Sequence, residues 1–221
     1  AAFFVASVAL LTVSAAQALV INSGTITPGF SKDNQNTDGS SSLGAAIELD
    51  LSFTKDSDTT GQWSATINNV GNGIVTVFGL SLNEDYGWSE TGFTFDPITA
   101  DCLSDKKFCK WSTGDATQIT SDFLSNVTLG AEAENPSPFR GIDEGEIMGL
   151  IWDVSGHFSS ITAATQFSDL IAPNCVNGAL VDFDSFWAAH IQVLENDQSD
   201  KIGGSSIIET PEPGALALFG I

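Results

Sequence analysis

The sequence predicts an all-β protein: an antiparallel β-sandwich, jelly-roll-like or Ig-like, with one short helix and apolar helical segments at the two termini. Apolar and polar residues alternate in several short runs, and turns rich in Gly, Asn and Asp separate these runs. Only one internal segment has the periodicity of a helix. Two stacked sheets would let the apolar faces of the runs share one core.

The clearest strand is expected at residues 45–54, where apolar side chains fall on one face and polar side chains on the other. An Asp- and Thr-rich turn follows, and the next strand carries Trp63 and Ile67. Four further strands are predicted at residues 74–82, 92–96, 145–154 and 186–194. The first of these four is apolar on both faces, which is typical of a central strand.

The predicted helix covers residues 159–173 and ends at Pro173. Its apolar face consists of Ala163, Phe167, Leu170 and Ile171. The sandwich domain is expected to span residues 19–195, with 19–41 as an exposed, polar lead-in. Residues 196–210 are polar and are predicted to be a linker.

The charge balance excludes several classes of partner. The chain has 221 residues, with 28 acidic against 7 basic side chains and a net charge of −21. Nucleic acids and anionic lipids are therefore unfavourable partners, because their phosphates need Lys and Arg. Fifteen Phe and five Trp argue against a disordered chain.

Residues 1–18 are predicted to be a signal peptide whose beginning is missing. They are apolar and small, and they end in Ala16-Gln17-Ala18, an A-x-A cleavage pattern with Ala16 and Ala18 at its small positions. The run is short for a membrane span, which needs about 20 apolar residues. Export follows from this interpretation, and a buried N-terminal helix is the alternative.

The sequence "PEPGALALFGI" at residues 211–221 resembles the start of a PEP-CTERM sorting signal. Residues 183–204 are similar to the segment that often precedes this signal. The resemblance implies Pro211, Glu212 and Pro213 as the recognition motif, an exosortase-type membrane enzyme as processing partner, and transient anchoring at the inner membrane. The mature protein would then be at the envelope surface or outside the cell.

The three cysteines allow one disulfide bond. Cys102 and Cys109 would close a small loop, which is the expected pairing in an oxidising compartment. A bond from Cys175 to one of them, or three unpaired thiols, are the alternatives.

No catalytic constellation is evident, and no enzyme activity is predicted. The two histidines are His157, expected in a loop, and His190, expected on a strand with a structural hydrogen bond. Neither a G-x-S-x-G nor an H-E-x-x-H motif is present. The chain carries too many carboxylates for any pair of them to be singled out as glycosidase residues.

No cofactor and no metal ligand set are predicted, although calcium is left as an alternative. Residues 33–45 and 56–67 both resemble the front of a calcium loop. An EF-hand loop needs a bidentate Glu at its twelfth position. That position is occupied by Ala45 in the first segment and by Ile67 in the second, so neither is an EF-hand. A site built on loop Asp and Asn oxygens remains open beside ordinary turn chemistry.

Surface contacts are expected near the cysteines and turns. Trp88 and Trp111 lie close to turns and are the candidates for exposed contacts, whereas Trp63, Trp152 and Trp187 should pack in the core. A basic knob around the cysteines could dock an acidic patch or an anionic polysaccharide, and it comprises Lys106, Lys107 and Lys110. A solvated loop is the alternative.

These features together favour an exported cell-surface or extracellular-matrix protein with an adhesive or structural, non-catalytic role, and extracellular polysaccharide is a candidate partner. A carbohydrate- or calcium-binding sandwich module is the alternative. A hydrolase with an unrecognised site is the third hypothesis.

Overall fold

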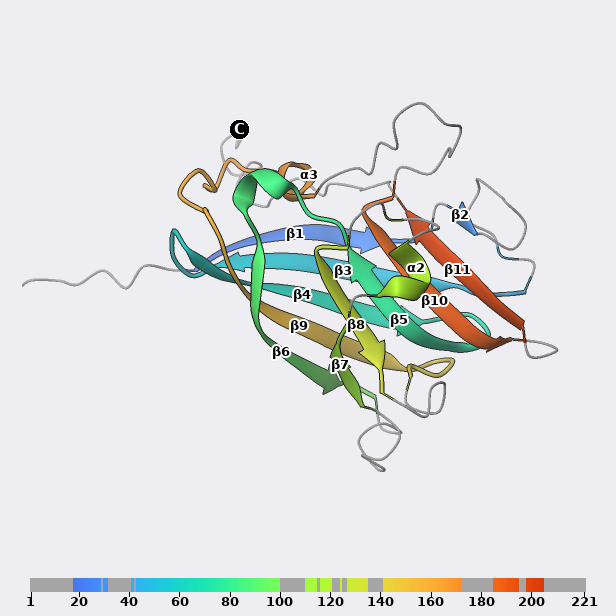
Figure 1. The fold of residues 1–221 in the computed structure, drawn as a ribbon. Coiled ribbons are helices and arrows are strands. Elements are labelled where there is room, and N and C mark those ends of the chain that lie inside the picture. Colours follow the sequence, from blue (N-terminus) through green and yellow to red (C-terminus); the bar gives the residue numbers. More distant parts are fainter. Residues whose placement is uncertain are drawn as a thin grey trace, which may run out of the picture.

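The protein is described by a computed structural model that covers residues 18–28, 30–31, 41, 43–99, 110–114, 116–120, 124, 127–134, 141–171, 185–194 and 198–204. These residues form two antiparallel sheets that pack face to face around one core (Figure 1). The predicted all-β sandwich is therefore confirmed. Both predicted terminal helical segments lie outside the described residues.

Sheet A has five strands, each antiparallel to its neighbours. In spatial order they are β1 (Leu19–Ile26), β3 (Ile47–Lys55), β4 (Thr60–Asn69), β9 (Ile147–Ser155) and β6 (Ser89–Pro97). The predicted alternation holds in β3 and β4, where every second residue is buried. The sheet is thus apolar on the inner face and polar on the outer face.

Sheet B has six strands. In spatial order they are β2 (Phe30–Ser31), β11 (Gln198–Gly204), β10 (Trp187–Leu194), β5 (Ile74–Leu80), β8 (Leu129–Ala133) and β7 (Trp111–Thr113). From Val75 onward β5 is buried on both faces, as predicted for a central strand.

The core between the sheets is rich in aromatic rings. Trp63, Trp152 and Trp187 are fully buried, which confirms their predicted packing. Trp152 of sheet A lies 6.3 Å from Phe78 of sheet B, measured between ring centroids, and its Nε1 donates to the carbonyl of Gly130 on β8. This side chain therefore ties the two sheets together through both packing and a hydrogen bond.

One end of the sandwich is closed by two short helical turns, η1 (Glu84–Tyr86) and α3 (Phe167–Leu170). A third, α2 (Thr117–Thr120), lies against sheet B. The rings that fill the closed end contact one another at centroid distances of 4.8 to 5.7 Å, and they belong to Phe53, Trp63, Trp88, Phe158 and Phe167.

The predicted lead-in and linker are both corrected by the structure. Within residues 19–41, β1 and β2 belong to the two sheets, and within residues 196–210, β11 pairs along its whole length with β10. Their polar composition reflects their position at or near sheet edges, where one face or one side meets water. The paired strands therefore reach residue 204, beyond the predicted domain end at residue 195.

The helix predicted over residues 159–173 is also corrected, because within its described part, residues 159–171, only Phe167–Leu170 is helical. The segment before it makes turns, and Thr165 donates its backbone N–H to the carbonyl of Thr162. Ile161, Phe167 and Leu170 are buried in the closed end of the sandwich. Their spacing produces a helix-like period although the chain crosses the end of the sheets by turns.

Candidate functional site

Most of the residues singled out by the sequence lie outside the described part of the chain. These are Ala16, Cys102, Lys106, Lys107, Cys109, Cys175, Pro211, Glu212 and Pro213. Ala18 is described, and it is exposed directly before β1. The disulfide and the sorting motif thus remain predictions.

The two tryptophans expected at the surface, Trp88 and Trp111, are both more buried than predicted. Trp111 is only 3% exposed, because β7 turns it inward opposite Ala133 of β8. Trp88 is half-buried in the aromatic end of the sandwich, and its Nε1 donates to the carbonyl of Asn83. The expectation of an exposed contact is wrong for Trp111, and Trp88 is largely occupied by its packing.

Lys110 is exposed, as predicted, but its charge is paired. Its Nζ lies 2.6 Å from Glu134 Oε2, and its carbonyl accepts the backbone N–H of Glu134, which extends the β7–β8 ladder. This lysine of the predicted basic knob is therefore engaged within the protein.

The two histidines lie in different environments. His190 is buried on β10, and its Nδ1 is within hydrogen-bond distance, 3.3 Å, of Gln192 Nε2, as expected of a structural histidine. His157 is exposed, and its backbone N–H donates to the carbonyl of Tyr86.

Two ionisable groups, Tyr86 in η1 and Glu90 on β6, have shifted pKa values. Burial raises the pKa of the Tyr86 phenol, and the charges of Asp169 and Asp85 raise it further. Partial burial raises the pKa of Glu90, although a hydrogen bond from Thr113 acts in the opposite direction. Glu90 on β6 and Thr113 on β7 thus join the margins of the two sheets.

Among the residues that the structure describes, no three His, Cys, Asp or Glu side chains gather as they would around a metal ion. The calcium-like segment at 56–67 forms the β3–β4 hairpin turn and most of β4, and in the turn Asp56 and Ser57 donate backbone N–H groups to the Thr60 carbonyl. Ordinary turn chemistry therefore accounts for these residues.

The outer face of sheet A presents a different arrangement. Directly paired residues form a row across all five strands, called the central row: Thr25, Asp50, Thr66, Gly149 and Asp96. A parallel row beside it consists of Asn22, Ser52, Ser64, Ile151 and Thr94. Almost all of these side chains are short, so the face is flat and mostly polar.

The outer face of sheet A is acidic. It carries Glu48, Asp50, Asp96 and Asp153, and the only lysine or arginine in its five strands is Lys55. Lys55 lies at the end of β3, where its Nζ donates to the carbonyl of Ile161 and pairs with Asp58. The four carboxylates are therefore not neutralised by a cation from these strands.

The four carboxylates differ in their hydrogen bonds. Glu48 accepts one from Asn68 at 3.0 Å, and Asp153 accepts one from Gln62 at 2.9 Å. Within the described residues, no hydrogen bond or ion pair engages the carboxylates of Asp50 and Asp96, which are both exposed. These two groups can accept donors from outside the chain.

A β-bulge in β1 opens a hollow beside Asp50. The register shifts between Asn22 and Thr25, and Gly24 takes a φ of 69°, which favours glycine. The buried hydroxyl of Ser23 accepts the backbone N–H of Leu51, which the bulge would otherwise leave without a partner. The local ladder is thus maintained while the outer surface is indented.

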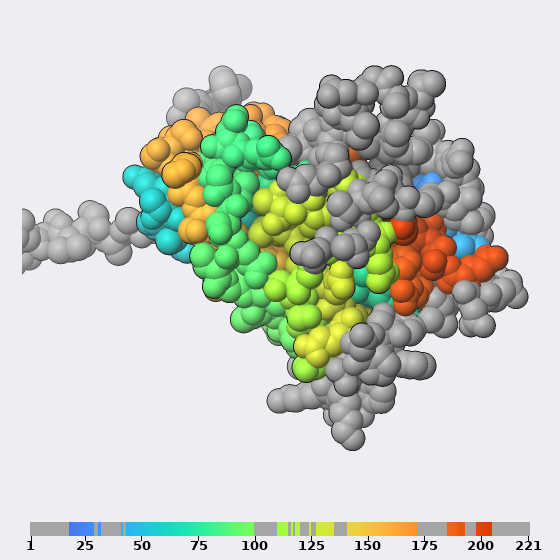
Figure 2. Space-filling view, in the orientation of Figure 1, coloured from blue at the N-terminus to red at the C-terminus, as the bar shows by residue number. Residues whose placement is uncertain are grey.

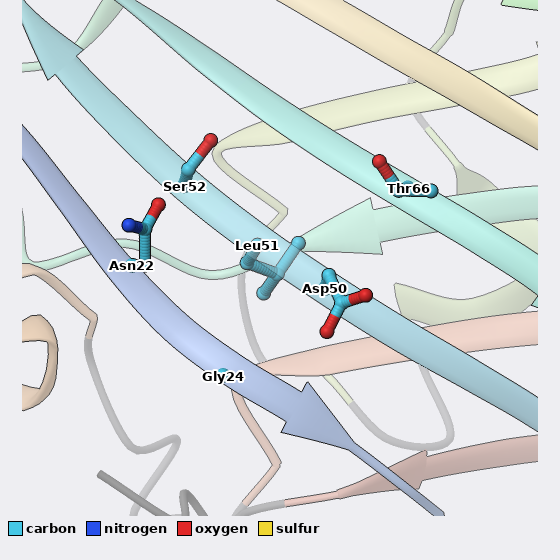
Figure 3. Close-up of a pocket in the computed structure, with 6 residues that line it drawn as sticks. All are labelled: Asn22, Gly24, Asp50, Leu51, Ser52 and Thr66. Atoms are coloured by element: carbon cyan, nitrogen blue, oxygen red, sulfur yellow. The ribbon is translucent and has the colours of Figure 1, made fainter. Parts of the chain in front are cut away.

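The hollow has a volume of about 270 Å³. Its lining residues are Asn22, Gly24, Asp50, Leu51, Ser52 and Thr66. Figure 3 shows the polar side chains of this set on three neighbouring strands, Asn22 on β1, Asp50 and Ser52 on β3 and Thr66 on β4, with Gly24 at one side of the group. Amide, hydroxyl and carboxylate groups can therefore act on one small polar ligand.

The outer face of sheet B is covered instead. Ala116, Ile119 and Leu124 are buried against Val77 and Ala188, so a second, smaller apolar cluster lies over the sheet. In the space-filling view, the yellow-green residues around α2 lie in front of this sheet (Figure 2). The polar face of sheet A has no comparable layer among the described residues, which makes it the candidate site.

Within the described part of the chain, no helix is both long and apolar enough to cross a bilayer. Comparison of the chain with family models, with curated proteins and with solved structures finds no match.

Proposed function

We propose that this chain is an exported, non-catalytic protein of the cell surface or extracellular matrix, and that it adheres to extracellular polysaccharide through the outer face of sheet A. The observation that carries the proposal is the contrast between the two outer faces. Sheet B is covered by an apolar layer, whereas sheet A presents flat rows of hydrogen-bonding side chains with a hollow.

The chemistry of this face supports a binding role. Asn, Ser, Thr and Asp side chains supply both donors and acceptors, as sugar hydroxyl groups require. The face spans five strands, about 19 Å at the usual strand spacing. A linear polymer can therefore make repeated contacts along it, each weak but additive through multivalency.

The positions of the described strands support export and sorting. β1 begins at Leu19, directly after the predicted cleavage residue Ala18, so removal of residues 1–18 would leave the strand whole. β11 ends at Gly204, ahead of the Pro211–Pro213 motif. Both predicted tags are thus separable from the strands. By its resemblance, the motif would be processed by an exosortase-type enzyme.

The test is co-sedimentation of the 221-residue chain with particles of cellulose, chitin and chitosan. We expect retention on at least one of them, and loss of that retention in Gly149→Val. A side chain at Gly149 would fill the floor of the central row, and its Cβ would meet nothing closer than Asp96 at 3.7 Å. The fold should therefore be preserved.

Thr59→Val is the control for an added apolar group, because it replaces a γ-hydroxyl with a γ-methyl at the exposed tip of the β3–β4 hairpin. It should be retained like the unchanged chain. The proposal would be contradicted if the chain is retained on none of the three polysaccharides. It would also be contradicted if Gly149→Val is retained as well as Thr59→Val.

A further inference from the structure

We propose that the outer face of sheet A binds a polysaccharide whose sugars carry free amino groups. Asp50 and Asp96 each pair with an ammonium group, and the hollow beside Asp50 holds one sugar ring. This inference rests on the proposed polysaccharide binding and specifies its ligand.

Charge is the first reason. The face carries four carboxylates, its five strands contribute only the engaged Lys55, and the chain as a whole has a net charge of −21. The resulting field concentrates cations and repels anionic polymers. A cationic polysaccharide therefore fits this face better than an acidic one.

The free carboxylates are the second reason. Glu48 and Asp153 are held by Asn68 and Gln62, but Asp50 and Asp96 have no such partner among the described residues. A polymer that covers these two groups removes them from water, which is costly unless charge and hydrogen bonds are restored. An ammonium group restores both, whereas a hydroxyl group supplies only the hydrogen bond.

The spacing is the third reason. Asp50 on β3 and Asp96 on β6 belong to one row and are separated by three strand intervals, about 14 Å. Thr66 and Gly149 lie between them, and neither projects far from the sheet. A thin, extended chain can therefore lie across the strands and reach both carboxylates.

The hollow favours a sugar over a basic peptide. A lysine side chain would satisfy Asp50 alone and leave the neighbouring polar groups to water. A sugar ring in the hollow can place an amino group on Asp50 and hydroxyl groups on Asn22, Ser52 and Thr66. The absence of an exposed aromatic side chain in the two rows also disfavours a neutral sugar, which would depend on stacking.

The experiment is isothermal titration calorimetry of the 221-residue chain at 150 mM salt with three probes: a soluble glucosamine oligomer, the same oligomer fully N-acetylated, and a polylysine of matched charge. We expect the glucosamine oligomer to bind at least tenfold more tightly than either of the other probes. Each of Asp50→Asn and Asp96→Asn should weaken it by about tenfold, because the amide oxygen can still accept a hydrogen bond from the ammonium group but no longer carries the charge that strengthens it.

The matched control is the double variant Asp56→Asn and Glu144→Gln. It removes two exposed carboxylates that lie in turns, outside the strands of sheet A, and should bind like the unchanged chain. Equal weakening in the control and in Asp50→Asn/Asp96→Asn would indicate general ion exchange and overturn the inference. Because both aspartates are exposed, their variants should keep the melting temperature.

Two further outcomes separate this inference from the proposed function. Equal affinity for the N-acetylated oligomer would reject the amino-group assignment but retain polysaccharide binding. Equal or tighter binding of polylysine would assign the face to basic peptides and overturn the inference. Failure to bind all polysaccharides in the sedimentation assay would instead reject the proposed function itself.

Discussion

The outer faces of the two sheets carry the same kind of backbone but differ in what lies over them. On sheet B, glycines make room for other parts of the chain: a Cβ at Gly79 would lie 2.9 Å from Ile119 Cδ1. On sheet A, a Cβ at Gly149 would meet nothing closer than 3.7 Å. Packing explains the glycine on sheet B, whereas on sheet A there is room for a side chain at Gly149, and the polysaccharide binding that we propose would use this space.

The largest expected effect comes from the layer over sheet B. Ile119→Ala removes a fully buried side chain from the smaller apolar cluster and should lower the free energy of unfolding by about 2–5 kcal/mol. Ser64→Ala, on the outer face of sheet A, should change it by less than about 0.5 kcal/mol. Urea denaturation measures both. Equal losses would show that the two faces are not different in packing.

An intermediate effect is expected from one substitution made on both faces. Gly130→Ala on β8 would drive its methyl group into the Gly114 carbonyl and the Ala116 side chain, and should cost about 1–3 kcal/mol. Gly149→Ala should change stability by less than about 0.5 kcal/mol. Thermal unfolding of the two variants compares them directly. A loss of stability in Gly149→Ala as large as that in Gly130→Ala would show that a side chain at Gly149 does not have free space around it.

The smallest effect concerns the margin where the two sheets meet. The folded protein raises the pKa of Glu90 above its ordinary value of 4.5, so the folded state holds this proton more tightly than the unfolded state. Above the raised pKa, the ionised carboxylate of Glu90 therefore opposes folding. This effect disappears as the pH falls below the ordinary pKa of 4.5. Glu90→Gln should be slightly more stable than the unchanged chain at pH 7 and equal to it near pH 3.

The measurement is the free energy of unfolding of Glu90→Gln and of the unchanged chain between pH 3 and pH 7. Glu144→Gln is the control for a general loss of negative charge. Glu144 is an exposed carboxylate in a turn. A gain in the control as large as the gain in Glu90→Gln would assign the effect to overall charge and not to the partial burial of Glu90.

The sandwich could be predicted because alternation reports directly on which face of a strand is buried. Residues of β3 and β4 alternate as expected, and the three core tryptophans follow the same rule. β1 and β11 could not be recognised in this way. The bulge in β1 interrupts its alternation, β11 has the composition of a loop, and the place of both strands in the sheets depends on pairing with β3 and β10.

The candidate site was even less accessible from sequence. The central row joins residues that are as far apart in the chain as Thr25 and Gly149, so it exists only once the strand order is known. Trp111 misled the prediction because its neighbours are polar and basic, whereas its pairing with Ala133 turns it inward. The bulge at Gly24 was the one local signal, since glycine within a polar strand often marks a bulge.

The strand order also governs when the protein can fold. In sheet B, β5 pairs with β10, and in sheet A, β4 pairs with β9, so each sheet joins early and late parts of the chain. Such distant pairings fold slowly, because a long loop must close before they form. Sheet A cannot be completed before Ser155 has been synthesised, and sheet B cannot be completed before Gly204. A polypeptide that stays unfolded for this long is well suited to being threaded through a narrow secretion channel before its core assembles.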